Sequence, residues 1–185
     1  MARPLPYPAA RYAPAMPRAP FQVLVLPYRR SAAGMQVAVM HRADYRVWQF
    51  ISGGGELGET VEDAARREGF EEAGIPVTAA YQRLDATAMI PACWFAAWPT
   101  WPEGVLVVPE RAFAVDVGAH TMQLSAEHDE LRWAHHDEAI ALLRFDSNRV
   151  ALWELHERLY PASRGKRSAF TAVHSRQCAC SPDEK

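Results

Sequence analysis

The clearest chemical feature of the chain is a group of three glutamates, Glu68, Glu71 and Glu72. On a helix that turns about 100° per residue, Glu72 lies about 40° to one side of Glu68 and Glu71 about 60° to the other. Ala64 and Ala65 share that face, so we expect it to turn inward. Inward-facing carboxylates resist ionising unless a cation joins them, and their hard oxygens favour Mg²⁺ or Mn²⁺. The alternative is a solvated helix face held by ordinary ion pairs.

Local signals predict the helix that would carry these glutamates. Thr60 followed by Asp63 is typical of an N-cap with its partner. Gly74, with Pro76 two residues later, is typical of a helix end. We therefore predict a helix over residues 61–73.

A glycine-rich stretch, residues 53–58, precedes this helix and is expected to form a loop. Three consecutive glycines can turn backbone groups toward a ligand with no Cβ in the way. The stretch leads into a helix N-terminus, which favours anions. An ordinary tight turn is the alternative.

Together these residues resemble the signature of the Nudix hydrolases, G-x5-E-x7-R-E-U-x-E-E-x-G-U, in which U is a bulky apolar residue. The matching positions are Gly53, Glu59, Arg67, Glu68, Glu71, Glu72, Gly74 and Ile75. One position departs from the pattern, because Gly69 stands where a bulky residue is usual. We expect Gly69 to admit a bulky neighbour from the sheet or from another helix.

The resemblance implies an α/β fold, a mixed curved β-sheet in an α/β/α sandwich. It also implies metal-dependent hydrolysis of a phosphoanhydride, with Mg²⁺ or Mn²⁺ bound by the Gly53 carbonyl, Glu68, Glu71 and Glu72. Glu59 and Arg67 are expected to pair and to orient this cluster. Arg67 and Glu71 are thus candidate catalytic residues, and the sequence leaves open which glutamate is the general base.

A further carboxylate from outside the signature is expected by the same resemblance. Glu127 is the best candidate, because it precedes a Trp-bearing strand and dihydroneopterin-triphosphate-type members have a similar Glu-His there. Glu130 is the rival, and an ordinary loop glutamate is the remaining alternative.

Substrate contacts are expected from Arg42, Gly54, Gly55 and Trp94. Dihydroneopterin-triphosphate-type members carry an arginine six residues before a matching Trp-Gln, as Arg42 is here, and such a cation can reach a polyphosphate. The alternative is an ordinary surface arginine. Three tryptophans at 94, 98 and 101 could stack a purine or pterin. A hydrophobic lid or a homodimer contact would explain them equally well.

The segment FDSNRVALWEL resembles the WSNR region of bacterial dihydroneopterin triphosphate pyrophosphohydrolases, which also act on nucleoside triphosphates. We therefore expect a nucleoside triphosphate or pterin triphosphate to be split into monophosphate and pyrophosphate. ADP-ribose or another nucleoside diphosphate derivative is the runner-up, favoured only by Pro91, sixteen residues beyond Ile75. A non-catalytic nucleotide sensor is the alternative of a different class, although sensors usually lack the signature glutamates.

The remaining elements follow from apolar patterning and turn residues. Strands are expected over residues 21–28, 35–42, 77–90 and 131–135, with a strand pair or one bent strand over 104–117. Helices are expected over residues 138–144, capped by Asp137, and from a cap at Asp146 or Ser147 to about residue 160.

Length and composition indicate one domain over residues 21–160, with a Pro-rich arm at 1–20 and a polar, disordered tail at 161–185. A net charge of −2 in 185 residues gives no reason to expect a nucleic acid polymer as partner. Three cysteines suit a reducing cytoplasm. No apolar stretch reaches the length of a membrane span, so no membrane partner is expected.

Deletion of residues 166–185 should leave the metal-dependent rate unchanged. That segment lacks the periodicity of a core element, and its His174, Cys178 and Cys180 make an incomplete metal site. Steady-state rates and circular dichroism of the shortened chain measure this. A folded variant that has lost the rate would contradict the prediction.

Overall fold

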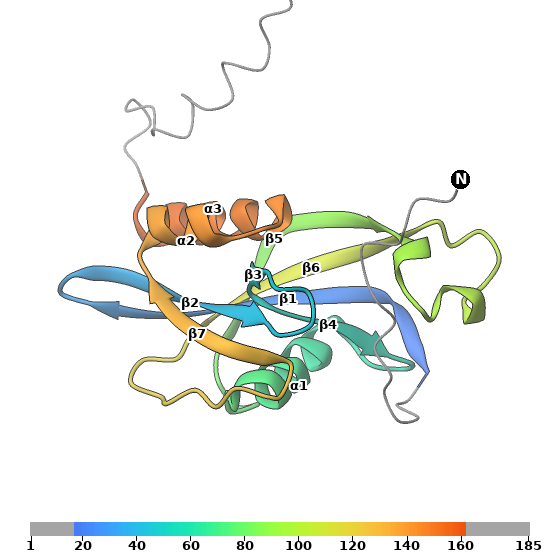
Figure 1. Ribbon diagram of the computed structural model, residues 1–185, viewed down its shortest axis with the longest axis horizontal. Helices are drawn as coiled ribbons and strands as arrows, with labels where there is room; N and C mark the ends of the chain where they lie inside the picture. The colour runs from blue at the N-terminus through green and yellow to red at the C-terminus, as the bar shows by residue number, and fades with distance from the viewer. Residues whose placement is uncertain (1–16, 162–185) are drawn as a thin grey trace, which may run out of the picture.

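The computed structural model describes residues 17–161, and its centre is a seven-stranded mixed sheet. The strands are β1 (Arg18–Ser31), β2 (Gly34–Arg42), β3 (Trp48–Gln49), β4 (Ile51–Glu56), β5 (Tyr81–Pro91), β6 (Val107–Asp116) and β7 (His128–Ala134). The helices are α1 (Val61–Ala73), α2 (His136–Leu142) and α3 (Asp146–Leu159), with 3-10 turns η1 (Ala92–Trp94) and η2 (Trp98–Thr100). Helix α1 covers one face of the sheet, and α2 and α3 cover the other (Figure 1). This is the predicted α/β/α sandwich.

Strand β1 is buried on both faces, as its continuous apolar run predicts. Leu24 and Leu26 pack in the core beneath α2 and α3. Val23 and Val25 alternate with them and pack in the core above α1. One strand therefore joins the two cores.

The strands around β1 determine where the sheet opens. Strand β6 runs parallel to β1 along one edge. On the other edge, β1 pairs with β2 through residues 28–31 and with β4 through residues 18–25, both antiparallel. Beyond this point β3 takes the place of β1 beside β2, while β7 pairs along the opposite edge of β2. Strands β2 and β4 therefore diverge, and the residues of interest lie around this divergence.

Helix α1 has the predicted bounds. Thr60 is the N-cap, and its Oγ1 accepts a hydrogen bond from the Asp63 backbone N–H at 3.1 Å. Gly74 ends the helix with φ 66°, a left-handed conformation that glycine adopts without strain. Ala64 and Ala65 are fully buried, so the inward face is the one that the alanines indicated.

Two boundaries near the glycines differ from expectation. Residues 53–56 belong to strand β4 rather than to a loop, because Gly53 pairs with Val23 and Gly54 with Gln22. Strand β1 begins three residues early, at Arg18, whose carbonyl accepts a 2.6 Å bond from Trp101 Nε1. Both differences depend on partners distant in the sequence, which local patterns do not reveal.

Other element ends also differ. Strand β5 begins at Tyr81, because residues 77–79 turn and their carbonyls at Val77 and Ala79 bind Arg66. Residues 104–117 contain the single strand β6, and β7 begins three residues before the expected strand. The predicted caps of α2 and α3 are wrong, since both helices begin without a side-chain cap. The Asp146 carboxylate instead accepts a bond from Arg149 Nη1 at 2.8 Å.

Residues 1–16 of the arm and 162–185 of the tail, including His174, Cys178 and Cys180, lie outside the described residues. Within residues 17–161, no helix is long and apolar enough to cross a membrane.

The expectation for Gly69 is confirmed. A Cβ added there would lie 2.1 Å from the hydroxyl oxygen of Tyr81, the first residue of β5. Burial raises the pKa of this hydroxyl to about 12. The missing side chain on α1 thus makes room for a ring from the sheet.

Gly69→Ala should therefore lower the free energy of unfolding. Alanine gains about 1 kcal/mol in helix propensity. The overpacking against Tyr81 should cost more, about 1–3 kcal/mol. Urea denaturation of Gly69→Ala, Tyr81→Phe and the double variant measures the coupling. Removing the hydroxyl should reduce the penalty; an alanine that stabilises the wild-type background would contradict this account.

Candidate active site

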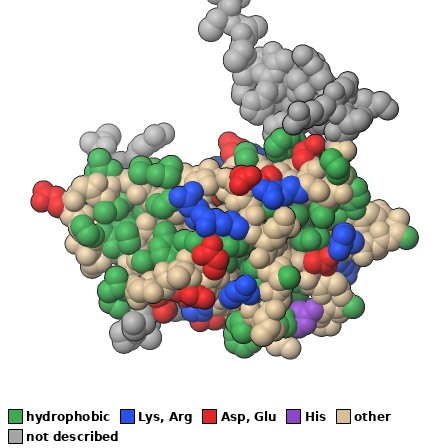
Figure 2. Space-filling view, turned by 180° about the vertical axis from the view of Figure 1, so that it is seen from behind, with side chains coloured by type: hydrophobic (Ala, Val, Ile, Leu, Met, Phe, Trp, Pro, Cys, Tyr) green, Lys and Arg blue, Asp and Glu red, His purple; other side chains and the backbone are tan. Residues whose placement is uncertain are grey.

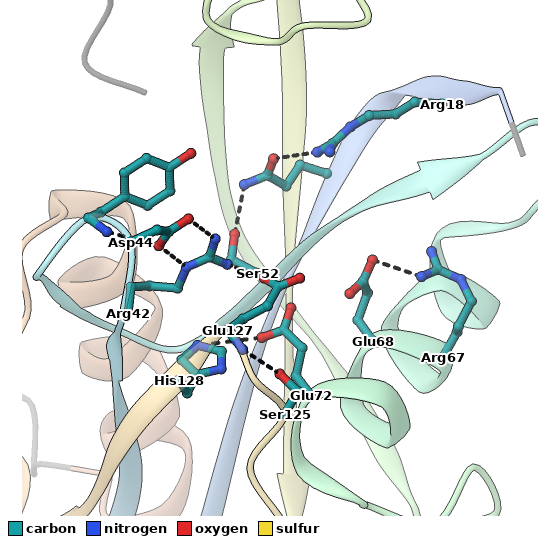
Figure 3. A network of polar contacts seen from close by, with 12 residues as sticks. Arg18, Arg42, Asp44, Ser52, Arg67, Glu68, Glu72, Ser125, Glu127 and His128 are labelled. Carbon is teal, nitrogen blue, oxygen red and sulfur yellow. Dashed lines mark hydrogen bonds and ion pairs between the residues drawn. The ribbon is translucent and has the colours of Figure 1, made fainter. Parts of the chain in front are cut away.

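The candidate site lies where β2 and β4 diverge, above the inward face of α1 (Figure 3). Gly53 of β4 and the carboxyl of Glu68 are in direct contact. A Cβ added at Gly53 would lie 1.9 Å from Glu68 Cδ, far inside van der Waals contact. Only glycine at this position lets the carboxyl approach the backbone of β4.

Arg67 ties the start of the signature to its end. Its Nε and Nη2 donate to the two oxygens of Glu59 at 2.9 and 3.0 Å, and Nη2 also donates to the Gly54 carbonyl at 2.8 Å. Its Nη1 reaches Glu68 at 2.8 Å and Glu71 at 3.1 Å. Burial disfavours the charge, but the bonds with Glu59 and Glu68 raise the pKa of Arg67 above its ordinary value. The predicted pairing of Glu59 with Arg67 is present.

Glu68 and Glu72 form a buried pair of carboxyls with 9% and 4% of their surface exposed. Burial raises the pKa of Glu68, although the charge of Arg67 lowers it. Burial also raises the pKa of Glu72 well above its usual value, and the charges of Glu68 and Glu127 raise it further. Two such groups resist carrying charge together unless a cation joins them.

His128, the first residue of β7, lies beside this pair. Its Nε2 is 3.6 Å from Glu72 Oε2, and burial lowers the pKa of the imidazole to about 4, so the ring is neutral at pH 7. Neither ring nitrogen, nor Glu72 Oε2, has a hydrogen-bond partner among residues 17–161. Buried polar atoms of this kind are rarely left unpaired without a ligand to satisfy them.

The donor set fits a hard divalent cation, because carboxylate and carbonyl oxygens are the ligands that Mg²⁺ and Mn²⁺ prefer. Glu68, Glu72 and the Gly53 carbonyl would hold it. The side chain of Glu71 is 55% exposed and contacts Arg67, so it stands apart from the other two glutamates. Within the described part of the chain, no three acidic, His or Cys side chains are gathered closely enough to form a complete metal site.

Arg42 lies in the opening between β2 and β4 and is engaged by two carboxylates. Its Nη1 donates to Glu127 Oε2 at 2.5 Å, while Nε and Nη2 donate to Asp44 at 2.9 and 2.7 Å. The residue is only 8% exposed. Burial lowers the pKa of its guanidinium, but the bond with Asp44 and the charge of Glu127 raise the pKa above its ordinary value. The phosphate-binding role expected for Arg42 stays a prediction, and the geometry gives it a second role, that of holding Glu127.

Glu127 and its rival Glu130 lie in different surroundings. The loop before β7 is fastened to α1 where the Ser125 N–H donates to the Glu72 carbonyl at 3.0 Å, and this brings Glu127 toward the buried pair. Glu130 pairs instead with Arg132 at 2.9 Å, with a side chain 52% exposed. Glu127 is therefore the additional carboxylate that lies near Glu72.

Gly54 and Gly55 lie under side chains of β1. A Cβ at Gly54 would meet the guanidinium of Arg18 at 2.1 Å, and one at Gly55 would meet the ring of Phe21 at 1.9 Å. Burial lowers the pKa of Arg18, although the charge of Glu68 raises it. The sequence pattern places Arg18 in the Pro-rich arm, so it does not predict this cation, which the structure places at the start of β1. Its only signal in the sequence is its position just before the apolar run of β1.

The three tryptophans have different environments. Trp101 is 9% exposed, and its indole N–H binds the Arg18 carbonyl, so it packs as a core residue. Trp98 donates to the Val105 carbonyl at 3.1 Å. Trp94 and Trp98 are 40% and 43% exposed, and with Met89, Leu106 and Val107 they are part of the exposed hydrophobic surface at the η1–η2 end (Figure 2). Ring stacking by Trp94 stays a prediction, as does the homodimer contact.

Comparison with known proteins bears on this geometry. The sequence profile of the NUDIX domain matches residues 20–154. The chain belongs to the Nudix hydrolase family. A candidate Nudix hydrolase from Listeria monocytogenes is 44% identical over 76% of this chain and 94% of that one, with a TM-score of 0.70. No curated protein sequence matches the chain.

Two further structures resemble this Nudix hydrolase. The dihydroneopterin triphosphate pyrophosphohydrolase of E. coli is 26% identical over 75% of this chain and 95% of that one, with a TM-score of 0.61. The Ap4A hydrolase of C. elegans is 18% identical over 76% of this chain and 98% of that one, with a TM-score of 0.60, a likeness of fold alone. The protein is thus a Nudix pyrophosphohydrolase, from a family that typically uses a divalent metal ion and nucleotide-type substrates.

Replacement of Arg42 should separate its two roles. If Arg42 holds Glu127, Arg42→Lys should lower kcat by about 10- to 100-fold with little change in KM. Lysine lacks the forked guanidinium that bridges two carboxylates. Loss of a residue that orients a site carboxylate typically lowers activity by this factor. Phosphate binding would instead leave Arg42→Lys active and raise KM in Arg42→Ala. Arg46→Lys, on a side chain 74% exposed, is the matched control.

Proposed function

We propose that this Nudix hydrolase splits a nucleoside triphosphate or pterin triphosphate into its monophosphate and pyrophosphate. The observation that carries the proposal is the buried pair of Glu68 and Glu72, in which Glu68 lies against the Gly53 backbone and is held by Arg67. The choice of a triphosphate is supported by the E. coli dihydroneopterin triphosphate pyrophosphohydrolase, which this chain resembles at 26% identity. The FDSNR segment, at the start of α3, supports the same choice.

Glu68, Glu72 and the Gly53 carbonyl are the proposed ligands of Mg²⁺ or Mn²⁺, and Glu71, which contacts Arg67, would join them by turning its side chain toward the pair. When bound, such an ion neutralises charge on the phosphates and lowers the pKa of a water molecule in its coordination shell. Arg67 fixes the carboxyl of Glu68 against β4, so that this carboxyl is already oriented to bind the ion. Arg18, whose guanidinium covers Gly54, is a further cation for a phosphate chain that follows β4.

The proposed reaction is a hydrolysis at the α-phosphorus. The water oxygen forms a bond to phosphorus, the bond from phosphorus to the bridging oxygen breaks, and pyrophosphate leaves. The water proton passes to a glutamate, for which Glu127 and Glu71 are the two candidates. Arg42 would keep Glu127 oriented for this step, because it donates to Oε2 of Glu127.

A substrate panel tests the proposal. It contains the common nucleoside triphosphates, dihydroneopterin triphosphate and ADP-ribose, each with Mg²⁺, and phosphate is assayed separately from pyrophosphate. We expect pyrophosphate from at least one triphosphate. Turnover of ADP-ribose alone would favour the nucleoside diphosphate-derivative alternative, and binding without turnover would favour a sensor.

Removal of the metal, or of one buried carboxylate, should abolish activity. Excess chelator should stop turnover, and Mg²⁺ or Mn²⁺ should restore it.

Glu72→Gln should lower the rate by orders of magnitude while the metal-free protein keeps or gains thermal stability, because one of two repelling buried charges is gone.

Glu62→Gln is the matched control, since this glutamate lies on the same helix with its side chain 49% exposed. Turnover in excess chelator would contradict the metal mechanism. A Glu72→Gln protein with a normal rate and a lower melting temperature would assign Glu72 a purely structural role.

A further inference from the structure

A cavity of about 210 Å³ lies between the sheet and the N-terminal end of α3, on the face opposite α1. Its lining combines apolar side chains of β1, β5, β6 and α3 with four polar residues. These are Thr87 of β5, Glu110 of β6, and Asp146 and Ser147 of α3. The Thr87 hydroxyl is engaged by Asp85 and Arg111, and the Asp146 carboxylate is exposed and bound to Arg149, so Glu110 is the buried carboxyl of the wall. The apolar residues are Leu24, Ala86, Ala88, Ala112 and Val150. Sites for whole drug-sized ligands usually hold about 300–1,000 Å³, so this cavity suits a single ring system.

Glu110 is the unusual member of this lining. It is 5% exposed, and burial raises the pKa of its carboxyl although Ser147 and Gln22 lower it. Oε2 accepts a bond from Gln22 Nε2 at 3.2 Å, but Oε1 is buried with no hydrogen-bond partner among residues 17–161. Leaving such an atom unpaired is unfavourable, so a buried carboxyl at a cavity wall indicates a ligand with an N–H group.

A chain of polar contacts connects this cavity with the carboxylate site. Gln22 donates to Glu110 and also to Ser52 Oγ at 2.7 Å, and it accepts a 3.1 Å bond from Arg18 Nη2. Arg18 in turn covers Gly54. In Figure 3, Arg18 lies on one side of β4, and Glu68 and Glu72 lie on the other.

The register of the sheet fits a ligand that spans both places. Gln22 pairs with Gly54 on one side and with Glu110 on the other. With adjacent strands about 4.8 Å apart, the backbones at Gly54 and Glu110 are about 10 Å apart. Among the described strands β4 pairs only with β1, so its other edge is open to a phosphate chain passing from the α1 face. A ribose, or the short side chain of a pterin, can bridge this span.

We propose that the cavity holds the ring of the substrate, and that Glu110 selects rings with the 2-amino-4-oxopyrimidine edge common to guanine and pterin. This inference rests on the proposed function and adds the ring specificity. That edge carries a ring N–H beside an amino group, and these two donors suit the buried Glu110 carboxyl, whose Oε1 has no hydrogen-bond partner among residues 17–161. Adenine has an acceptor nitrogen at the position where guanine and pterin have the ring N–H. Two acceptors, this nitrogen and a Glu110 oxygen, would then face each other, so adenine should bind poorly.

The test compares the wild type with Glu110→Gln on GTP, dihydroneopterin triphosphate, ATP and tripolyphosphate, which has no ring. The variant should lose about 10- to 100-fold in kcat/KM on GTP, on dihydroneopterin triphosphate or on both, as expected for a hydrogen bond to a charged group. The rates on ATP and tripolyphosphate should change little. Comparison of the GTP and pterin arms identifies which source supplies the ring. Glu138→Gln, an exposed glutamate on α2, is the matched control.

A direct binding measurement separates this inference from the proposed function. Isothermal titration of wild type and variants with GMP and with neopterin reports ring binding without hydrolysis, and Glu110→Gln should weaken it. If Glu110→Gln fails to fold, Ala88→Leu fills the cavity from β5 and should weaken ring binding while tripolyphosphate turnover persists.

Unchanged ratios of GTP and pterin to ATP in a folded Glu110→Gln protein would overturn the inference while leaving the pyrophosphohydrolase function intact. A ring-dependent loss in Trp94→Ala, with none in Glu110→Gln, would also overturn it, because the ring would then lie over η1. If no triphosphate is hydrolysed but GMP or neopterin binds through Glu110, the proposed function fails and the ring site stands.

Discussion

The burial of two like-charged carboxyls, Glu68 and Glu72, on the inward face of α1 is the constraint on which the rest of the structure depends. Neutral hydrophobic residues would make a more stable helix face here, since buried ionisable groups cost free energy unless they are paired. Arg67 compensates part of this cost for Glu68 and, through Glu59, fastens the end of β4 to α1. Beside this pair, Glu72 Oε2 and the His128 nitrogens have no hydrogen-bond partner among residues 17–161, as expected of a site that a cation would complete.

The sheet supplies the second condition, which is access to this pair from above. Strand β1 exchanges β2 for β4 partway along its length, and the two partners diverge. Arg42 at the end of β2 and Glu127 before β7 occupy the opening, and their ion pair joins two segments that are 85 residues apart. The bonds of Arg42 to Asp44 and Glu127 hold its guanidinium in one orientation. A fixed guanidinium in turn holds the Glu127 carboxylate in place, as a functional side chain requires.

The two faces of the sheet differ in the side chains that they gather. The α1 face gathers carboxylates and small residues, which leaves space for ions and phosphates. The α3 face gathers apolar side chains around a cavity with one buried carboxyl, which suits a flat ring. A bulge in β5 interrupts its pairing with β6 between Arg83 and Thr87. The backbone N–H groups of Asp85 and Ala86 donate to Glu154 of α3 instead, which fastens α3 to this face of the sheet. In the proposed arrangement the ring of the substrate binds on the α3 face, its phosphates are cleaved on the α1 face, and the link between them passes the edge of β4.

The sequence by itself determined the parts of this protein that depend on local rules. The bounds of α1, its inward alanine face, the pairing of Glu59 with Arg67 and the gap at Gly69 all follow from spacing along one helix and one recognised signature. The tertiary structure decided what depends on distant partners. Strand pairing turned the glycine stretch into β4 and drew Arg18 out of the expected arm, and it gave Arg42 two carboxylate neighbours. Glu110 lay in a strand with no motif around it, and only the packing of α3 against the sheet, 36 residues later, makes it a cavity wall. Local patterns show which face of a helix or strand is apolar. Which residue from a distant part of the chain packs against that face depends on how the whole chain folds.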